Sequence, residues 1–330
     1  MTVASRDGNG WVRCELGHRH WGRFGAAGLL AFVADGPVLL QRRTWWSHHG
    51  GTWGLPGGAR DSHESALAAA MREAAEECGV PPDAVQQRGV FTDDHGGWAY
   101  TSVLAEAPAP FAVESDDDET DEVAWVSVPA VAGLDLHPGF AAHWDELRAE
   151  LAPVTIIVDG ANVMGSRPDG WWRDRAGAAT RLRAELAPLT TQGITDLPGG
   201  MQGPATAADL PLDGGRFRRS ADMAGGRTRM RWLPDVVLVV EGAARSAAAG
   251  PAAAGSAAAG SAGVGADAGG AAGSPVRIVA APGSGDDTIA DLALSIPGRR
   301  IVVTADRELR NRSIEAGASV AGPRWLFGQL

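Results

Sequence analysis

Short apolar runs separated by turn residues dominate the N-terminal part of the chain. Residues 26–43 hold two such runs, AAGLLAFVA and PVLLQRR, on either side of Asp35-Gly36, and this pattern predicts a β-hairpin. The runs RGVFTDD, WAYTSVLAE and EVAWVSV predict three further strands, and helices are expected near 128–133 and 139–151. Between the hairpin and these strands, apolar residues recur at three- and four-residue spacing and predict an amphipathic helix: Ala66, Leu67, Ala70, Met71 and Ala74.

Both ends of this helix carry recognisable signals. The sequence Leu-Pro-Gly-Gly before it predicts a sharp turn that ends at Gly58. Asp61 is the expected N-cap, with Glu64 three residues later completing a capping box. Gly79 is expected to end the helix in a left-handed conformation.

The polar side of the helix carries three carboxylates at i, i+3 and i+4: Glu73, Glu76 and Glu77. Like charges at this spacing destabilise a bare helix by a few tenths of a kcal/mol per pair, roughly. Bound Mg²⁺ would reverse that effect, because hard divalent ions prefer carboxylate oxygens. A solvated acidic face is the alternative interpretation, but Arg72 and Glu64 lie beside the acids and favour a built site.

These residues resemble the box of the Nudix hydrolases, G-x5-E-x7-R-E-U-x-E-E-x-G-U. The matching positions are Gly58, Glu64, Arg72, Glu73, Ala74, Glu76, Glu77, Gly79 and Val80, where Ala74 is smaller than the usual aliphatic residue. The resemblance implies an α/β/α sandwich with a mixed sheet over residues 21–152, after an N-terminal extension of residues 1–20.

The resemblance also implies a Mg²⁺-dependent (or Mn²⁺-dependent) pyrophosphohydrolase that acts on a nucleoside diphosphate derivative. Glu73, Glu76 and Glu77, with the carbonyl of Gly58, would hold the metal. A glutamate of the box or of the E-x-x-E-x-x-W run, Glu119 or Glu122, would act as the base, and Glu64 and Arg72 would orient the carboxylates. A MutT-like (deoxy)nucleoside triphosphate is the default substrate, and a nucleotide sensor without turnover is the alternative.

From Pro153 onward, strands alternate with helical segments, and this order predicts a parallel sheet. The strands are VTIIVD, DVVLVV, VRIVAA and RRIVVTA, and polar residues follow each of them. In open parallel sheets such residues meet at one edge, as expected for a metal-dependent phosphodiesterase. The alternative is that the acids cap helices or solvate loops. The residues concerned are Asp159, Asn162, Glu241, Asp286, Asp287 and Asp306.

This second half resembles the NYN/PIN-like ribonuclease domains, of the YacP-like branch, through VDGANVMGS, VVEGAA, GDDTIADLA and VTADRELRNR. The resemblance implies a PIN-like α/β domain over 153–330, with RNA as a partner and a second metal site at the residues just named. Two inserts interrupt the domain. Residues 190–230 contain arginines that could contact the phosphates of RNA, although a solvated loop is favoured. Residues 243–274, almost all Ala, Gly and Ser, are expected to be disordered.

Composition narrows the remaining choices. The net charge of −11 argues against broad adhesion to nucleic acid or anionic lipid, and the absence of lysine excludes Walker-type phosphate sites and Schiff-base chemistry. No apolar run is long enough to predict a membrane span, and no signal peptide is recognisable, so a cytoplasmic protein is expected. The oligomeric state is not predicted.

Two smaller groups of residues remain open. Cys14, His18 and His20 lie close in sequence, but zinc takes four ligands and no fourth lies nearby, so a surface strand with incidental histidines is favoured. Trp45, Trp46 and Trp53 are compatible with stacking on a base and with packing under a loop.

Overall fold

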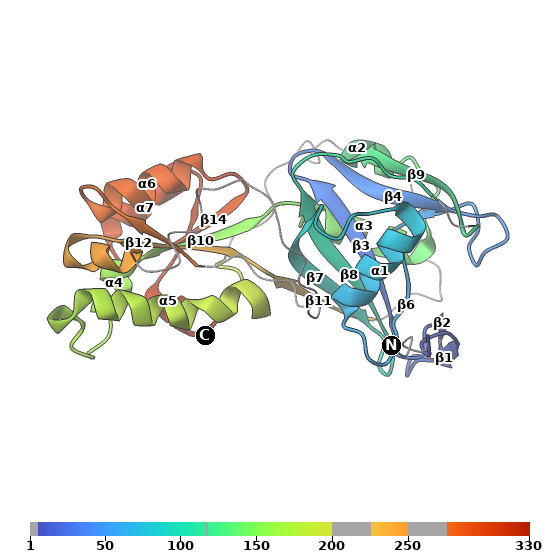
Figure 1. The fold of residues 1–330 in the computed structure, drawn as a ribbon, viewed down its shortest axis with the longest axis horizontal. Coiled ribbons are helices and arrows are strands. Elements are labelled where there is room, and N and C mark those ends of the chain that lie inside the picture. Colours follow the sequence, from blue (N-terminus) through green and yellow to red (C-terminus); the bar gives the residue numbers. More distant parts are fainter. Residues whose placement is uncertain (1–5, 116–117, 200–225, 250–275) are drawn as a thin grey trace, which may run out of the picture. The chain divides into compact units, whose positions relative to one another are not determined.

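The computed structural model describes residues 6–115, 118–199, 226–249 and 276–330 (Figure 1). The chain divides into two compact units that meet in sequence at Pro153. The first contains Met1–Ala152 and Gly203–Arg231, and the second contains Pro153–Gln202 and Trp232–Leu330. Each unit has its own sheet and core, and each is described separately below.

The first unit is built on a mixed eight-stranded sheet. Its strands run in the order β11-β7-β8-β3-β4-β5, with β6 paired to β3 and β9 to β4. The β3–β8 pair is parallel, whereas β4 is antiparallel to β3, β5 and β9. The bounds are β3 (Ala26–Val33), β4 (Pro37–Arg43), β5 (Trp53–Gly54), β6 (Gly57–Ala59), β7 (Gln86–Asp94), β8 (Ala99–Ala107), β9 (Thr120–Ser127) and β11 (Arg227–Trp232).

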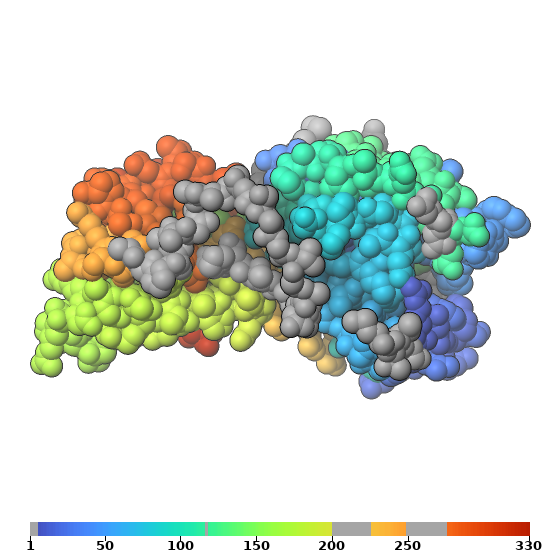
Figure 2. Space-filling view, viewed as in Figure 1, coloured from blue at the N-terminus to red at the C-terminus, as the bar shows by residue number. Residues whose placement is uncertain are grey.

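Helices cover both faces of this sheet. Helix α1 (Ala66–Cys78) packs on one face over Leu29, Leu39 and Val103, and its outer side lies at the surface (Figure 2). Helices α2 (Val128–Val131) and α3 (Pro138–Arg148) lie on the other face, over a cluster that includes Phe32 and Leu40. Residues of the two clusters alternate along β3 and β4, because successive side chains of a strand point to opposite faces of the sheet. The parallel and antiparallel pairs described above confirm the expected mixed sheet.

The start of α1 differs from the prediction. Ser65, not Asp61, is the N-cap, and its hydroxyl accepts a hydrogen bond from the Ala68 amide at 3.1 Å. Asp61 is instead buried and accepts a hydrogen bond from the Gly8 amide at 2.7 Å. This contact holds the N-terminal segment against the turn, and the helix starts further along the chain than predicted. Gly79 ends α1 with φ 65°, as predicted.

The described part of the N-terminal extension is folded into the first unit. Strands β1 (Trp11–Arg13) and β2 (Arg19–Trp21) form an antiparallel hairpin, and the Glu15 amide donates to the Gly96 carbonyl at 2.9 Å. Gly96 lies in the turn between β7 and β8. The hairpin is thus fixed to a turn that is distant in sequence.

The second unit contains a five-stranded sheet with the order β13-β12-β10-β14-β15, in which every pair is parallel. Helices α4, α5 and α8 pack on the core at one face, and α6 and α7 on the core at the other. The expected parallel sheet is confirmed. The strands are β10 (Val154–Asp159), β12 (Asp235–Val240), β13 (Arg277–Ala280), β14 (Arg299–Val303) and β15 (Ser319–Ala321). The helices are α4 (Gly160–Gly165), α5 (Arg175–Gln192), α6 (Gly285–Ser295), α7 (Arg307–Glu315) and α8 (Pro323–Phe327), with 3-10 turns η1 (Trp171–Arg173) and η4 (Gly242–Ala249).

The two predicted inserts are only partly described. The arginine-rich end of the first one, expected in a solvated loop, is strand β11 on the edge of the first unit's sheet. Met230 explains this placement, because it lies between exposed arginines and packs against the cluster under α3 that includes Phe32 and Leu40, here called the α3-side core. The expectation of disorder falls largely on 250–275, which lies outside the described residues, as does the basic piece RFRRS.

Candidate active site

Arg72 connects the turn before α1 to the acidic face of that helix. Its guanidinium binds Glu64 through two hydrogen bonds, Nε to Oε1 at 2.7 Å and Nη2 to Oε2 at 2.9 Å, and also donates to the Ala59 carbonyl at 3.1 Å. Its Nη1 donates to Glu73 at 2.7 Å. The hydrogen bond with Arg72 lowers the pKa of Glu64, and the same contact raises the pKa of Arg72. The pair therefore stays ionised and fixes the Glu73 side chain.

Glu77 is the most buried of the three carboxylates. Its Oε2 accepts hydrogen bonds from the Gly57 amide at 2.7 Å and from Gln41 Nε2 at 3.0 Å. Gln41 in turn accepts from the Thr120 hydroxyl at 3.0 Å, so β4, β6 and β9 together fix this carboxylate. Burial, and then the neighbouring Glu73, raise the pKa of Glu77 to about 8.

Glu73 and Glu76 complete the acidic group. Burial raises the pKa of Glu73, and its Oε1 would lie 2.7 Å from a Cβ added at Gly58. Only glycine therefore lets the backbone come this close to the carboxylate. Glu76 contacts Arg6 and lies 3.5 Å from Arg72.

This set of donors fits a hard divalent cation. Carboxylate oxygens are the ligands such ions prefer. Burial, and then neighbouring acids, raise the pKa of Glu73 and Glu77, and a bound cation would reverse this effect by favouring the charged carboxylates. The sequence prediction placed Glu73, Glu76, Glu77 and Gly58 at one site. The structure brings Glu73 against Gly58, and the raised pKa of Glu77 reflects its burial and then the charge of Glu73 nearby.

The structure does not bring Glu122 to the box. Along β9, the odd-numbered Val123 and Trp125 pack on the α1 side of the sheet, whereas the even-numbered Val126 packs on the α3 side. By the same alternation Glu122 lies on the α3 side, where it pairs with Arg42 at 3.3 Å on the surface. Glu119, the other glutamate of the pattern, lines the cavity described next.

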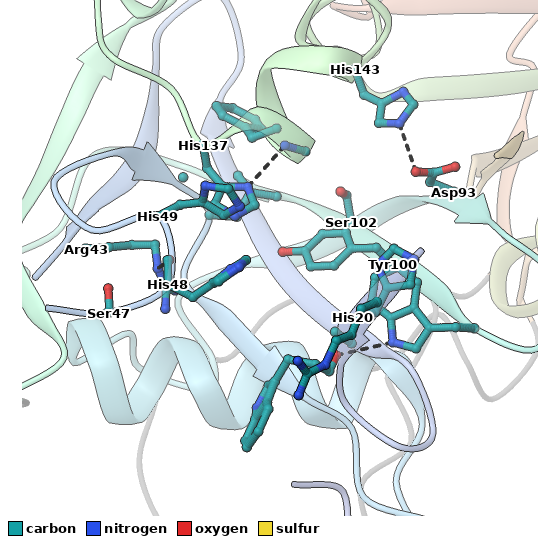
Figure 3. Close-up of a pocket in the computed structure, with 18 of the residues that line it drawn as sticks. His20, Arg43, Ser47, His48, His49, Asp93, Tyr100, Ser102, His137 and His143 are labelled. Atoms are coloured by element: carbon teal, nitrogen blue, oxygen red, sulfur yellow. Dashed lines mark hydrogen bonds and ion pairs between the residues drawn. The ribbon is translucent and has the colours of Figure 1, made fainter. Parts of the chain in front are cut away.

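A cavity of about 880 Å³ opens in the first unit next to the box (Figure 3). Gly54 and Leu55, from the turn before the box, form part of its wall, and so do Arg43 and Tyr100. The charge of Arg43 affects the pKa of Glu77, and the charge of Glu77 affects the pKa of Tyr100. The cavity therefore lies next to the carboxylates. The cavity is rich in aromatic side chains: Trp11, Trp21, Trp46, Phe91, Trp98 and Phe140.

The three tryptophans left open by the sequence separate here. Trp46 lines the cavity, Trp53 packs beside the α3-side core, and Trp45 is 81% exposed. Stacking on a ligand in this cavity is thus open to Trp46 alone of the three.

Several cavity residues were missed at the sequence level. Asp93 accepts hydrogen bonds from His95 Nε2 at 2.9 Å and His143 Nε2 at 3.1 Å, and burial lowers the pKa of His137 to about 3. Asp93 belongs to the predicted strand RGVFTDD, but His143 comes from α3, 50 residues later. No sequence pattern links the two.

In the second unit, polar residues at the strand ends line a small cavity of about 170 Å³. Asp159 accepts hydrogen bonds from the Thr304 hydroxyl at 2.8 Å and the Asn162 amide at 3.0 Å, and burial raises its pKa. Burial, then Asp306, then Glu241, raise the pKa of Asp286. Of the six residues predicted here, five line the cavity: Asp159, Asn162, Glu241, Asp286 and Asp306.

Asp287 does not line this cavity. Its carboxylate pairs with Arg312 of α7 at 2.8 Å, because successive residues at the start of a helix point in different directions. Two of the other acids also serve the alternative role of capping, since Asp159 caps α4 and Asp306 caps α7.

Comparison with known proteins decides the family. The NUDIX domain model matches residues 22–147, which contain the box and most of the cavity wall. "Putative 8-oxo-dGTP diphosphatase 3" of Mycobacterium tuberculosis is 47% identical over 160 residues, which cover 46% of this chain and 72% of that protein. The chain belongs to the Nudix family.

As a Nudix hydrolase, the protein is an enzyme that acts on acid anhydrides. It is also 41% identical over 155 residues to the "Nucleoside triphosphate pyrophosphatase/Nudix hydrolase fusion protein" of Bifidobacterium longum, over 42% of this chain and 32% of that one. A solved Nudix hydrolase, RenU of M. smegmatis, is 49% identical and covers 43% of this chain and 93% of its own, with a TM-score of 0.40. Within the described residues of this Nudix hydrolase, no helix is long and apolar enough to cross a membrane.

Proposed function

We propose that this Nudix hydrolase cleaves the pyrophosphate bond of a nucleoside diphosphate derivative with Mg²⁺ (or Mn²⁺), and that (deoxy)nucleoside triphosphates, including oxidised ones, are its substrates. The observation that carries the proposal is the buried Glu77 with the half-buried Glu73 at Gly57-Gly58, next to an aromatic cavity of about 880 Å³. The products would be a nucleoside monophosphate and the remaining phosphorylated group.

Each group of the site has a separate role in this proposal. When bound to Glu73, Glu76, Glu77 and the Gly58 carbonyl, the ion would neutralise the diphosphate oxygens and lower the pKa of an attacking water. Arg72 and Glu64 hold Glu73 in place. Arg43, a basic side chain on the cavity wall beside Glu77, would attract the phosphates.

The nucleobase would occupy the aromatic cavity. Indole rings such as Trp46 and Trp98 offer flat faces for stacking, and cavities of this size hold small-molecule ligands. The name of the Mycobacterium tuberculosis relative gives an oxidised purine nucleotide as substrate. This name favours a nucleoside triphosphate here.

Glu119 is the base we favour outside the box. It lines the cavity, whereas Glu122 lies on the surface with Arg42. A general base must come within hydrogen-bond reach of the water it activates, directly or through one water.

A hydrolysis screen of the full chain with Mg²⁺, in which the nucleotide products are separated by chromatography, tests the proposal. Its substrates would be the four dNTPs, 8-oxo-dGTP, ADP-ribose, NADH and a dinucleoside polyphosphate, with Glu77→Gln purified in parallel. We expect turnover of triphosphates above all others, absent from the variant. Turnover of ADP-ribose or NADH alone would refute the substrate class. Tight nucleotide binding without any turnover would favour the alternative, in which the Nudix unit is a sensor.

A second function, metal-dependent cleavage of RNA, is proposed for the second unit. The observation in its favour is the cavity where Asp159, Asp286 and Asp306 converge at the carboxyl ends of parallel strands. Acidic groups of this kind bind the divalent ions of phosphodiesterases.

Asp286 and Asp287 provide a matched test of this second function. Asp286→Asn removes a carboxylate from the cavity, whereas Asp287→Asn removes one that pairs with Arg312 outside it. With single-stranded RNA and Mn²⁺, we expect Asp286→Asn to abolish cleavage and Asp287→Asn to retain it. Equal cleavage by wild type and Asp286→Asn would exclude this cavity as the nuclease site.

A further inference from the structure

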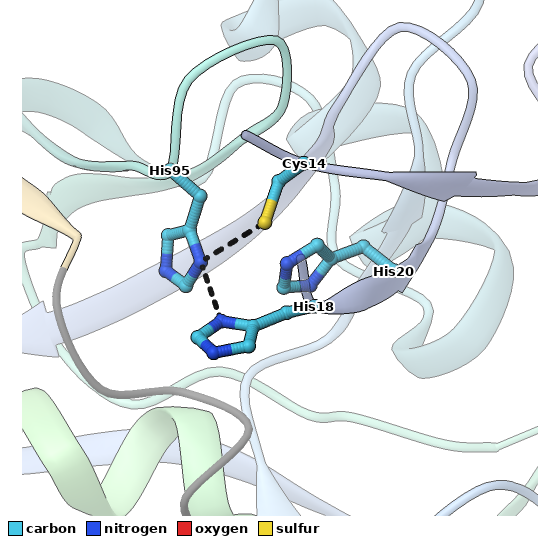
Figure 4. A group of neighbouring side chains, drawn as sticks. All are labelled: Cys14, His18, His20 and His95. Carbon is cyan, nitrogen blue, oxygen red and sulfur yellow. Dashed lines mark hydrogen bonds between the residues drawn. The ribbon is translucent and has the colours of Figure 1, made fainter. Parts of the chain in front are cut away.

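Four potential metal ligands from two distant parts of the chain meet at the N-terminal hairpin (Figure 4). Cys14, His18 and His20 come from the β1–β2 hairpin, and His95 comes from the turn between β7 and β8. Each offers one nitrogen or sulfur atom, and all four atoms lie within 4.8 Å of one another. The sequence offered no fourth ligand near Cys14. The predicted surface position is wrong for Cys14 and His20, which are buried.

Two of the ligand–ligand distances are close to those of tetrahedral coordination. A zinc ion with Zn–N bonds of about 2.0–2.1 Å and a Zn–S bond of about 2.3 Å separates two nitrogens by about 3.3 Å and nitrogen from sulfur by about 3.5 Å. His18 Nδ1 and His95 Nδ1 are 3.4 Å apart, and Cys14 Sγ lies 4.0 Å from His95 Nδ1. A shift of a few tenths of an ångström would bring the sulfur to its bonding position.

His20 has a buried polar atom that no hydrogen bond explains. The side chain is 5% exposed, and its Nε2 lacks a hydrogen-bond partner within the part of the chain that the structure describes. The ring stacks on Trp98, with centroids 3.8 Å apart, and this contact fixes its orientation beside His95. An unpaired buried nitrogen costs free energy, which ligation to a metal would offset.

His95 is prepared for ligation by its second nitrogen. Its Nε2 bonds to the buried Asp93 carboxylate at 2.9 Å, and its Nδ1 faces the cluster. Carboxylate–histidine pairs of this kind orient metal-binding imidazoles.

We propose that Cys14, His18, His20 and His95 bind one structural Zn²⁺ ion. Four protein ligands leave no open position, and a closed site of this kind is structural and not catalytic. The one cysteine and three histidines exclude a disulfide and select a borderline-soft metal, unlike the all-oxygen site of the Nudix box.

The ion would fix one wall of the substrate cavity. Trp11, Arg19 and Trp21 of the hairpin and Trp98 of the β7–β8 segment all line that cavity. Among the contacts that join the hairpin to the turn without a metal is the hydrogen bond from the Glu15 amide to Gly96. The ion would therefore hold the hairpin in place, because β1 and β2 lie outside the eight-stranded sheet.

Metal analysis of the full chain, purified without a histidine tag and dialysed, tests the proposal directly. We expect one zinc per chain in wild type, none in Cys14→Ser or His95→Gln, and one in the control His48→Ala. His48 belongs to a separate histidine group with His49 and His137. Zinc retained by Cys14→Ser, or lost from His48→Ala, would overturn the assignment.

Two measurements on wild type avoid the risk that a variant fails to fold. Cobalt exchanged for zinc should give an intense tetrahedral spectrum with a thiolate-to-cobalt charge-transfer band, and a cobalt spectrum without that band would overturn the proposal. Chelation should speed hydrogen exchange at the Cys14 and Glu15 amides, which are bonded to His18 and Gly96, and leave α1 unchanged. Exchange at these amides that is unaffected by chelation would also refute a structural ion.

Discussion

At the level of single residues, the site depends on how a few side chains are oriented. Arg72 makes hydrogen bonds to Glu64, Glu73 and the Ala59 carbonyl at once, which a planar guanidinium allows and an ammonium does not. It is 22% exposed and Glu64 is 11% exposed, so the pair is largely shielded from water.

Arg72→Lys keeps the charge but loses the paired hydrogen bonds to Glu64. We expect turnover to fall by about 10–100-fold, as for other residues that orient metal ligands. The free energy of unfolding should fall by about 1–3 kcal/mol, because partly buried acceptors lose their donors. Steady-state kinetics and urea unfolding would measure both effects. Unchanged turnover would show that Glu73 needs no support from Arg72.

Glu119 and Glu122 form a second test of single side chains. Glu119→Gln should lower kcat by about 10²–10⁴-fold if it is the base. Glu122→Gln should leave kcat unchanged, because that side chain pairs with Arg42 on the surface. The reverse result would mean that β9 presents Glu122, and not Glu119, to the substrate.

At the level of helices and strands, the sequence predicted the box helix well because its signals are local. The three- and four-residue spacing and Gly79 fixed the body and end of α1. The N-cap was mispredicted because Asp61 is engaged by Gly8, 53 residues earlier in the chain. Strands β5 and β6 were missed because they are two and three residues long and gain their hydrogen bonds from β4 and β3.

Gly57 illustrates how tightly β6 is packed. A Cβ added there would lie 2.4 Å from the Ala27 carbonyl oxygen on β3, and the Gly57 amide also holds Glu77. Gly57→Ala should therefore lower the free energy of unfolding by about 1–3 kcal/mol and reduce turnover. In the control Gly133→Ala, the added Cβ meets nothing closer than 3.4 Å, so both quantities should stay near wild type. Equal effects of the two substitutions would contradict this account of the turn.

Across the molecule, long-range pairing decides what sequence reasoning could not reach. The aromatic cavity collects residues from Trp11 to Leu147, and the Cys14 cluster needs His95. The strand ends of the second unit were predictable, because a parallel sheet places all its carboxyl ends at one edge. Strand β11 was not, since it joins the first unit's sheet from within an insert of the second.

The two units carry separate polar sites, so substitutions in one should not affect the chemistry of the other. Asp286→Asn should leave nucleotide hydrolysis within about twofold of wild type, because the two cavities share no residue and sites without shared partners act additively. Release of the nucleoside monophosphate by the full chain would check this. A large loss of hydrolysis would show that the second unit takes part in the Nudix reaction.

The sharpest test of the box as the active site is the Mg²⁺-dependent turnover of a nucleoside triphosphate by Glu77→Gln against wild type. Glutamine keeps the size of the side chain and can retain the hydrogen bond from the Gly57 amide, but it cannot supply the negative charge that would bind the cation. We expect a folded variant whose kcat falls by several powers of ten at every Mg²⁺ concentration. A folded variant with wild-type kcat would contradict the assignment of these carboxylates to catalysis.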